Sequence, residues 1–352
     1  MSKYNVVTQK QNYQNYQRQL EEWRNAHAGS ANVNSIAAAD VNQHLVLGHE
    51  PTAQHTIDYV SPQMRLNATT GYGPETYETS ESVNGRVLQV TYSNLKKSYY
   101  TDNDGNVHHI SKIVFSFSDL NHNALGKDGK TYLCLHNDPA NGFSYNGSNG
   151  VTLTETFYDE NGNLVNIASG SGYLAATSLN AAYGNPAAFT VTKTGTPIHV
   201  ESVSVLNGGR AVGLQGSGIV ASGNTLKAPA TIDYANSGKN IVYNLGHGKA
   251  VNSPQSTAST WQGDDWDNNP NETYWATGLV SLSGSSVTLR FSVDTLVQDE
   301  TVYVTTQTII PSTPGPKKPA PVSVHYHYDV AQAISQAELY AIFNAFSCAY
   351  YT

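Results

Sequence analysis

The stretch that best decides the fold class is Ile110-Ser111-Lys112-Ile113-Val114-Phe115-Ser116-Phe117. Several runs of this kind alternate apolar and polar residues with a period of two, so one face of a β-strand is buried and the other is solvated. Comparable runs occupy residues 87–92 and 286–293, and short apolar runs separated by Gly, Asn and Asp continue from about Leu45 to about Thr306. Many strands without intervening helices predict a mainly β protein, built as a sandwich or barrel.

Two short segments carry the residues that tight turns between strands require, Asp102-Asn103-Asp104-Gly105-Asn106 and Asp159-Glu160-Asn161-Gly162-Asn163. They also resemble calcium loops, but an EF-hand loop needs its glycine at position six. Here Gly105 and Gly162 stand at position four. We therefore interpret both segments as hairpin turns.

The two ends of the chain differ from the β region. Near the N-terminus, spacings of three and four residues form the a/d seam of a helix, made by Tyr13, Tyr16, Leu20, Trp23 and His27. A row of aromatic side chains is a surface on which a polyproline helix packs, and the proline-rich segment 311–321 predicts such a helix. We predict a helical stalk segment at 1–29, a β-sandwich domain at 30–306 that opens with a loop, a proline-rich linker at 307–322 and a short strand and helix tail at 323–352.

Composition narrows the classes of function. Charged residues make up only 13% of the 352 residues, and Asn, Ser, Thr, Gly and Tyr are abundant, as in many extracellular β-proteins. The 23 tyrosines against 8 phenylalanines indicate a wet contact surface, because tyrosine offers an apolar face and a polar tip. The formal net charge is −8 and the densest basic spots are lysine pairs, so we expect no general binding of nucleic acid.

Neither cysteines nor apolar segments fix the compartment. Cys134 and Cys348 lie far apart and have no zinc spacing, and Cys134 sits in an apolar run that predicts a buried free thiol. No stretch of about 18 apolar residues predicts a membrane span, and no apolar leader follows Met1. We expect an exported protein of this kind to be targeted and anchored by further parts of a longer parent protein.

The search for catalytic patterns argues against an enzyme. The chain has no GxSxG, HExxH or GxxxxGK[ST] motif. A glycosidase needs two carboxylates on opposite sides of its substrate, whereas Asp264, Asp265 and Asp267 are too close in sequence for that. His325 and His327 share one face of a predicted strand, and His108-His109 follows a turn, but a third metal ligand is not evident, so we interpret them as surface histidines.

The strongest candidate for a binding site is the tryptophan-rich segment 261–275, which holds three of the four tryptophans. Indole rings stack on sugar faces, Asp and Asn bind hydroxyl groups, and clustered carboxylates hold calcium. A structural alternative is that the tryptophans anchor a long loop to the core. The predicted ligand-binding residues are Trp261, Asp264, Asp265, Trp266, Asp267, Asn268, Tyr274 and Trp275, of which Asp264, Asp265 and Asp267 are the candidate ligands of a structural Ca²⁺.

Several segments together resemble the variable-region domain shared by antigen I/II adhesins and glucan-binding protein C of Gram-positive bacteria. Five pieces occur in the order of that family and cover roughly residues 45–295: Glu50-Pro51-Thr52-Ala53, residues 90–100 with 110–114, Asn137-Asp138-Pro139, residues 156–163 and residues 275–284. The resemblance implies a lectin-like β-supersandwich at the tip of a stalk that pairs a helix with a polyproline helix. It also implies a bound calcium and a binding cleft near the tryptophan-rich segment.

Sequence and resemblance together predict a non-catalytic domain of a bacterial cell-surface adhesin. We expect it to bind glycans or glycoproteins of a host or biofilm matrix, outside the cell and attached to the cell wall through parts of a parent protein. The alternative is a protein-binding or aggregation module that recognises a host glycoprotein, another bacterium or lipoteichoic acid and has no affinity for small glycans. Loops set specificity on a shared scaffold, so the ligand stays open between these two hypotheses.

Overall fold

The structure is a computed structural model. It describes residues 3–27, 34–67, 75–124, 127–177, 179, 181–185, 190–192, 196–217, 219–227, 242–244, 249–251, 276–295, 301–304 and 308–311. The chain forms two compact units, one made of residues 1–15 with 318–352 and the other of residues 16–317. The second unit contains all the strands described below, and no helix among the described residues is long and apolar enough to cross a membrane.

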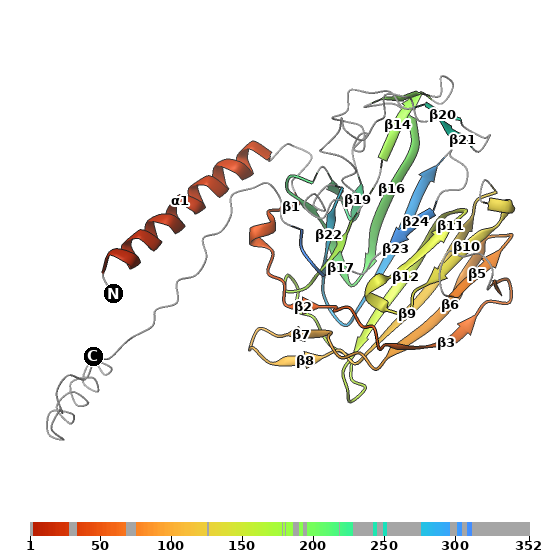
Figure 1. Cartoon of the computed structure of the whole chain (residues 1–352), viewed down its shortest axis with the longest axis horizontal. Helices are drawn as coiled ribbons and strands as arrows, with labels where there is room; N and C mark the ends of the chain where they lie inside the picture. The colour runs from red at the N-terminus through yellow and green to blue at the C-terminus, as the bar shows by residue number, and fades with distance from the viewer. Residues whose placement is uncertain are drawn as a thin grey trace. The chain divides into compact units, whose positions relative to one another are not determined.

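One large sheet of twelve strands forms the main layer (Figure 1). Ten of its strands follow one another across the sheet in the order β21 (Lys249–Val251), β20 (Val242–Asn244), β15 (Thr190–Thr192), β14 (Ala181–Asn185), β16 (Thr196–Asn207), β23 (Ser286–Thr295), β12 (Ser148–Tyr158), β9 (Lys112–His122), β6 (Val83–Ser93) and β3 (Gln54–Val60). The other two, β18 (Val220–Ser222) and β19 (Thr225–Lys227), form a hairpin that joins the sheet through β16.

Three smaller sheets accompany it. The five-stranded sheet has the order β24 (Thr301–Val304), β11 (Phe143–Asn146), β10 (Thr131–Leu135), β5 (Glu75–Thr79) and β4 (Arg65–Leu66). The four-stranded sheet has the order β1 (Ser35–Ile36), β17 (Gly209–Leu214), β22 (Gly278–Leu282) and β13 (Tyr173–Ala176), and the three-stranded sheet has the order β2 (Leu45–Val46), β7 (Tyr99–Thr101) and β8 (Val107–His109). All the described pairings are antiparallel except that of β1 with β17.

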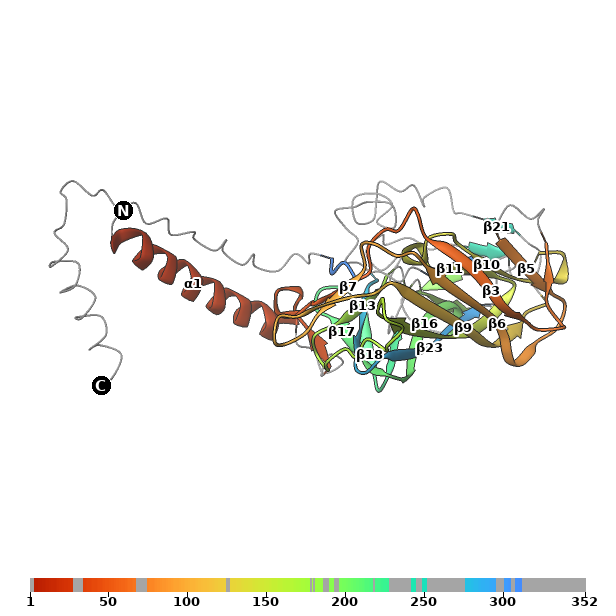
Figure 2. The same cartoon turned by 90° about the horizontal axis from the view of Figure 1, so that it is seen from below.

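The smaller sheets pack on the large one through one large apolar core. Figures 1 and 2 show the five-stranded sheet lying over the large sheet. Aromatic rings join the layers: the Phe143 ring of β11 lies 5.0 Å from Phe117 of β9 and 5.4 Å from Phe291 of β23, both edge-on. Such edge-to-face pairs are favoured because the positive edge of one ring meets the negative face of the other. The predicted mainly β sandwich is therefore confirmed.

The N-terminal segment is helical, as predicted: α1 spans Lys3–His27. Tyr16 of the predicted seam is only 6% exposed and packs against Ala37, whereas Tyr13 is 44% exposed. The side chains of Leu20, Trp23 and His27, and nearly all of the proline-rich segment, lie outside the described residues. Packing of the aromatic seam on a polyproline helix, and the predicted part boundaries, therefore stay predictions.

The loop predicted to open the β-sandwich domain is not wholly irregular. Its Ser35–Ile36 forms β1, which pairs in parallel with β17, and Ala38–Asp40 forms a 3₁₀ turn, η1. Two further 3₁₀ turns are η2 (Lys127–Gly129) and η3 (Pro139–Asn141). A strand of two residues is too short to show an alternating sequence pattern. Ser35 and Ile36 are extended because they pair with the edge of β17.

Glu50 explains why several of the family-like segments occur together. Its carboxylate is buried and accepts hydrogen bonds from the backbone N–H of Lys96 (2.8 Å) and Lys97 (2.6 Å) and from the Ser98 hydroxyl (3.0 Å). The backbone N–H of Glu50 in turn donates to Asp138, at 2.8 Å. Three of the five pieces are thus joined into one structural network, because a buried carboxylate needs donors for its oxygens.

Candidate functional site

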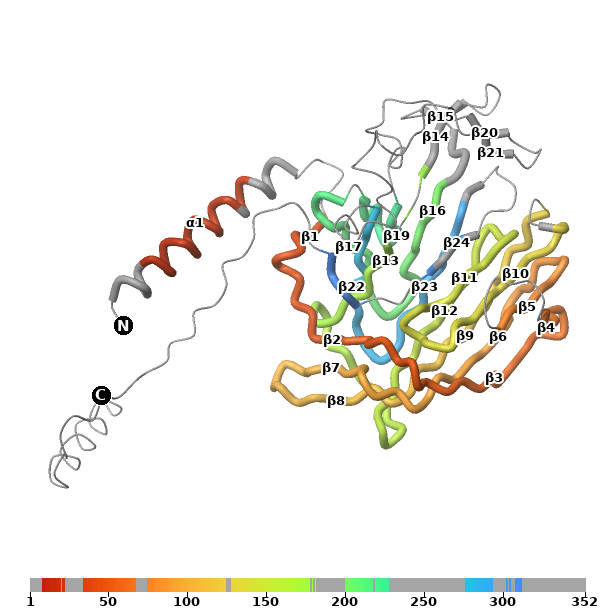
Figure 3. The backbone as a smooth tube through the Cα atoms, viewed as in Figure 1, coloured from red at the N-terminus to blue at the C-terminus, as the bar shows by residue number. Residues whose placement is uncertain are grey.

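A narrow cleft lies inside the sandwich, where the four-stranded and five-stranded sheets meet over the large sheet. β13 is an edge strand of the former and β24 of the latter, and Figure 3 shows them on either side of β23. Its cavity volume is only about 30 Å³, room for a water molecule or a single hydroxyl group, and the surrounding empty space of about 550 Å³ includes open solvent. The described lining comprises Tyr145, Glu155, Leu174, Ala175, Ala176, Thr177, Leu179, Glu201, Ser202, Val203, Val280, Leu289, Phe291, Ser292, Val302 and Val304.

Most of this lining is apolar. Strands β12, β16 and β23 supply the floor, including Val203, Leu289 and Phe291, while Leu174 and Val302 are among the wall residues. Two carboxylic acids interrupt the apolar surface, Glu155 on β12 and Glu201 on β16. An apolar lining with a few polar groups is typical of small-molecule sites, but such sites usually enclose roughly 300–1,000 Å³, so a ligand larger than a hydroxyl group must widen this cleft of about 30 Å³.

Glu155 is 1% exposed and stands at an inward position of its strand. Its lateral neighbours in the sheet are apolar, Phe115 on β9 and Val287 on β23. Among the described residues, neither carboxyl oxygen has a hydrogen-bond partner. Burial alone raises the pKa of Glu155 from 4.5 to about 8, because the ionised form loses its hydration.

Glu201 is 7% exposed and lies opposite Val293 of β23, whereas Glu155 lies opposite Val287 of the same strand. The two acids are therefore six residues apart along β23, or about 20 Å at roughly 3.3 Å per residue. A single cation between them is excluded by that separation. The cleft thus carries two separate acids.

Sequence reasoning missed both acids, although the signal was present. Residues 151–157 read Val-Thr-Leu-Thr-Glu-Thr-Phe and residues 201–205 read Glu-Ser-Val-Ser-Val. In each run, period two places the glutamate on the same face as the valine, leucine or phenylalanine side chains. A charged residue on the apolar face of a strand is rare, and it points to a polar site inside the sandwich.

The site predicted from sequence lies outside the described residues, since 252–275 are not described. The structure therefore tests neither the binding role of Trp261, Trp266 and their neighbours nor the calcium ligands Asp264, Asp265 and Asp267. The segment ends three residues before β22, the strand that supplies Val280 to the cleft. His325 and His327 also fall outside the description.

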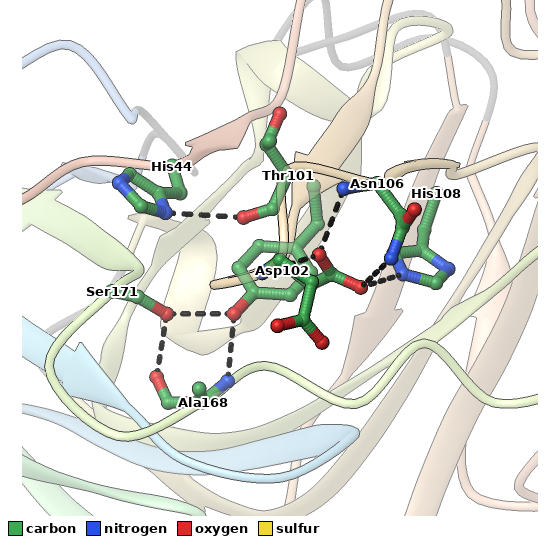
Figure 4. Close-up of polar contacts among 9 residues, drawn as sticks. His44, Thr101, Asp102, Asn106, His108, Ala168 and Ser171 are labelled. Atoms are coloured by element: carbon green, nitrogen blue, oxygen red, sulfur yellow. Dashed lines mark hydrogen bonds and ion pairs between the residues drawn. The ribbon is translucent and has the colours of Figure 1, made fainter. Parts of the chain in front are cut away.

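Both Asp-rich segments are turns, as predicted. Asp102 accepts hydrogen bonds from the backbone N–H of Asp104 and Asn106, from the Asn106 side chain and from His108 at 2.9 Å (Figure 4). These bonds hold the pKa of Asp102 far below its usual range, with the His108 contact the largest cause. Because the carboxylate is fully engaged within the β7–β8 hairpin, it caps the turn and needs no cation.

Asp159 repeats the arrangement with Asn161 and Asn163, and its pKa is lowered by the same kind of bonds, chiefly that from the Asn163 side chain. Behind the first hairpin, the Tyr100 hydroxyl accepts from the Ala168 N–H at 3.0 Å and lies 2.7 Å from the Ser171 hydroxyl (Figure 4). This contact joins the hairpin to the loop before β13. Within the described part of the chain, no three His, Cys, Asp or Glu side chains are grouped as a metal site.

Comparisons with known proteins agree with this architecture. The family model of glucan-binding protein C matches residues 29–309. One similar solved structure is that of glucan-binding protein C of Streptococcus mutans, described as mediating sucrose-independent and sucrose-dependent adherence. It is 18% identical to this chain, with a TM-score of 0.55, and the match covers 91% of this chain and 95% of that protein's chain. Another is the adhesin domain of PrgB from Enterococcus faecalis, solved bound to DNA, which is 16% identical to this chain with a TM-score of 0.50. The match covers 80% of this chain and 98% of the PrgB chain.

No curated protein gives a match. At these identities, the two structural likenesses establish the fold, which is that of bacterial adhesin domains. The family match extends over more than half of the chain, so the chain belongs to the glucan-binding protein C family. The kinship with antigen I/II adhesins stays a prediction.

Proposed function

We propose that this chain is the ligand-binding domain of a bacterial cell-surface adhesin, and that its ligand is a neutral glucan held at the cleft between β13 and β24. Membership of the glucan-binding protein C family carries the proposal, and it agrees with the predicted non-catalytic adhesin domain. The cleft supports it, because an apolar surface with a few buried polar groups suits the mixed faces of a sugar. Wall attachment, a biofilm role and a structural Ca²⁺ remain part of the proposal.

Binding of a neutral dextran tests this proposal, alongside a glycan array in the presence and absence of EDTA. We expect dextran binding at neutral pH that Val203→Trp abolishes, because an indole on the floor strand β16 fills the cleft. Leu206→Trp, an exposed position on the same strand, is the matched control. Far-ultraviolet circular dichroism of the variants verifies that both are folded.

Each outcome decides between the hypotheses. Loss of binding in the presence of EDTA would show that a divalent cation supports the site. Absence of binding to any glycan, combined with adhesion of the purified domain to cells or glycoproteins, would overturn the proposal in favour of the protein-binding module. Normal dextran binding by a folded Val203→Trp protein would place the glycan away from this cleft.

A further inference from the structure

We propose that Glu155 is held as a neutral carboxylic acid on the floor of the cleft, and that it determines specificity by hydrogen bonding to a hydroxyl group of an uncharged ligand. This inference rests on the proposed function, since it names a contact within the same site.

The position of Glu155 is one where an apolar side chain would serve the fold better. Val151, Leu153 and Phe157 hold the other inward positions of β12 and are all buried. Leucine has nearly the volume of glutamic acid and would leave no polar atom without a partner. Burying a carboxyl group without a hydrogen bond costs stability, so the acid weakens the sandwich unless a ligand engages it.

The surroundings of Glu155 keep it uncharged. The other titratable side chains of the described lining are Tyr145 on β11 and Glu201 on β16, and no Lys, Arg or His is among them. The neighbours on either side in the sheet, Phe115 and Val287, carry no charge. Since no cationic side chain of the described residues faces the carboxyl group, burial decides its protonation, and the raised pKa agrees with that arrangement.

A neutral acid presents one O–H donor and one carbonyl acceptor. A sugar hydroxyl presents the same pair, so the two groups can exchange hydrogen bonds in both directions. A cation would require the ionised carboxylate, and a carboxylate or phosphate on the ligand would offer acceptors only. The chemistry therefore favours a neutral polyol over an ion.

The test uses the full chain and three variants, Glu155→Gln, Glu155→Leu and the exposed control Glu160→Gln. Isothermal titration with a neutral dextran oligosaccharide is run once in EDTA and once with added Ca²⁺, on either side of the pKa of about 8, at acidic and at clearly alkaline pH. We expect the wild-type affinity to fall about tenfold or more at alkaline pH, because the O–H donor is lost. Glu155→Gln keeps a donor and an acceptor at every pH, so its affinity stays within about threefold across the range.

Glu155→Leu separates a binding role from a structural one. We expect it to lose dextran binding at least about tenfold while melting at a higher temperature than the wild type at neutral pH. A group that served only the fold would show the opposite change in melting temperature. Glu160→Gln is expected to match the wild type in both measurements.

Dextran binding by Glu155→Leu that equals the wild type overturns this inference and leaves the proposed function standing. Binding that strengthens with rising pH, requires Ca²⁺ and disappears in Glu155→Gln would show a cation site and would also overturn it. If the wild type binds no dextran at any pH, with Ca²⁺ or in EDTA, the proposed function fails and the ligand contact fails with it. A Glu155→Leu protein that melts below the wild type refutes the claim that the acid is held there at the expense of stability.

Discussion

Glu50 and Glu155 are both buried glutamates, yet their surroundings differ completely. Three donors hold the carboxylate of Glu50, whereas the carboxyl group of Glu155 lies in an apolar cleft without a described partner. A buried carboxylate that is hydrogen-bonded supports the fold, and one that is not destabilises it. The two residues therefore allow opposite predictions.

Glu50→Ala is expected to destabilise the domain by about 3 kcal/mol, because it leaves one buried and two part-buried donors of the 96–98 loop without their acceptor. Urea unfolding followed by tryptophan fluorescence measures this loss. Glu160→Ala removes an exposed glutamate and should change the free energy of unfolding by less than about 0.5 kcal/mol. Equal stability of the two variants would show that the network around Glu50 contributes nothing.

Glu155 makes the stability of the domain depend on pH. Its pKa is raised from 4.5 to about 8 in the folded chain, so folding favours the protonated form. The domain is most stable below pH 4.5 with respect to this group, loses stability as the pH rises towards 8, and changes no further above that. The slope over this window is about 1.4 kcal/mol per pH unit at most.

Unfolding of the wild type and of Glu155→Gln at a series of pH values isolates this contribution. The difference between the two free energies of unfolding cancels the titration of all other groups, including the histidines. We expect that difference to grow in favour of Glu155→Gln as the pH rises. A pH-independent difference would contradict the assignment of a neutral buried acid.

Among the secondary-structure elements, the link between β16 and β17 joins the large sheet to the four-stranded sheet through Gly208. Gly208 has φ +74°, and a Cβ there would lie 1.9 Å from the Ser286 carbonyl oxygen. The chain can therefore cross from the large sheet to the four-stranded sheet at this point only because Gly208 has no side chain. Gly223, in the β18–β19 turn, also has positive φ, +57°, but faces open space.

Gly208→Ala is expected to cost more than about 3 kcal/mol, because backbone strain adds to a collision with backbone atoms that cannot move away. Gly223→Ala carries only the strain, about 1 kcal/mol. Thermal unfolding of the two variants gives the comparison. A similar loss in both would show that the close approach of Gly208 to β23 is relieved by a small shift.

For the whole molecule, charge decides which polymers it can bind. The chain has 27 acidic against 19 basic residues, a net charge of −8. Binding to DNA without sequence preference depends on Lys and Arg that displace counterions from phosphates. The PrgB adhesin domain was solved bound to DNA, but 16% identity transfers only the fold to this chain.

We therefore expect no measurable binding of double-stranded DNA at physiological salt, monitored by fluorescence anisotropy of a labelled duplex. A polybasic peptide added to the same duplex is the positive control. Binding that weakens steeply as salt is raised would contradict the expectation, because it would reveal a local basic groove that the overall charge conceals.

The amino-acid sequence by itself determined the mainly β class, the N-terminal helix and the two Asp-capped turns. These features depend on neighbours close along the chain: period-two alternation, a three- and four-residue seam, and Asp and Gly at fixed positions in a turn. Only the tertiary structure decided which sheet edges meet, and so it alone revealed the cleft between β13 and β24 and the isolation of Glu155 within it. Strands distant in sequence form that cleft, and the energy of a buried acid depends on which groups surround it in space, so no local pattern could specify either.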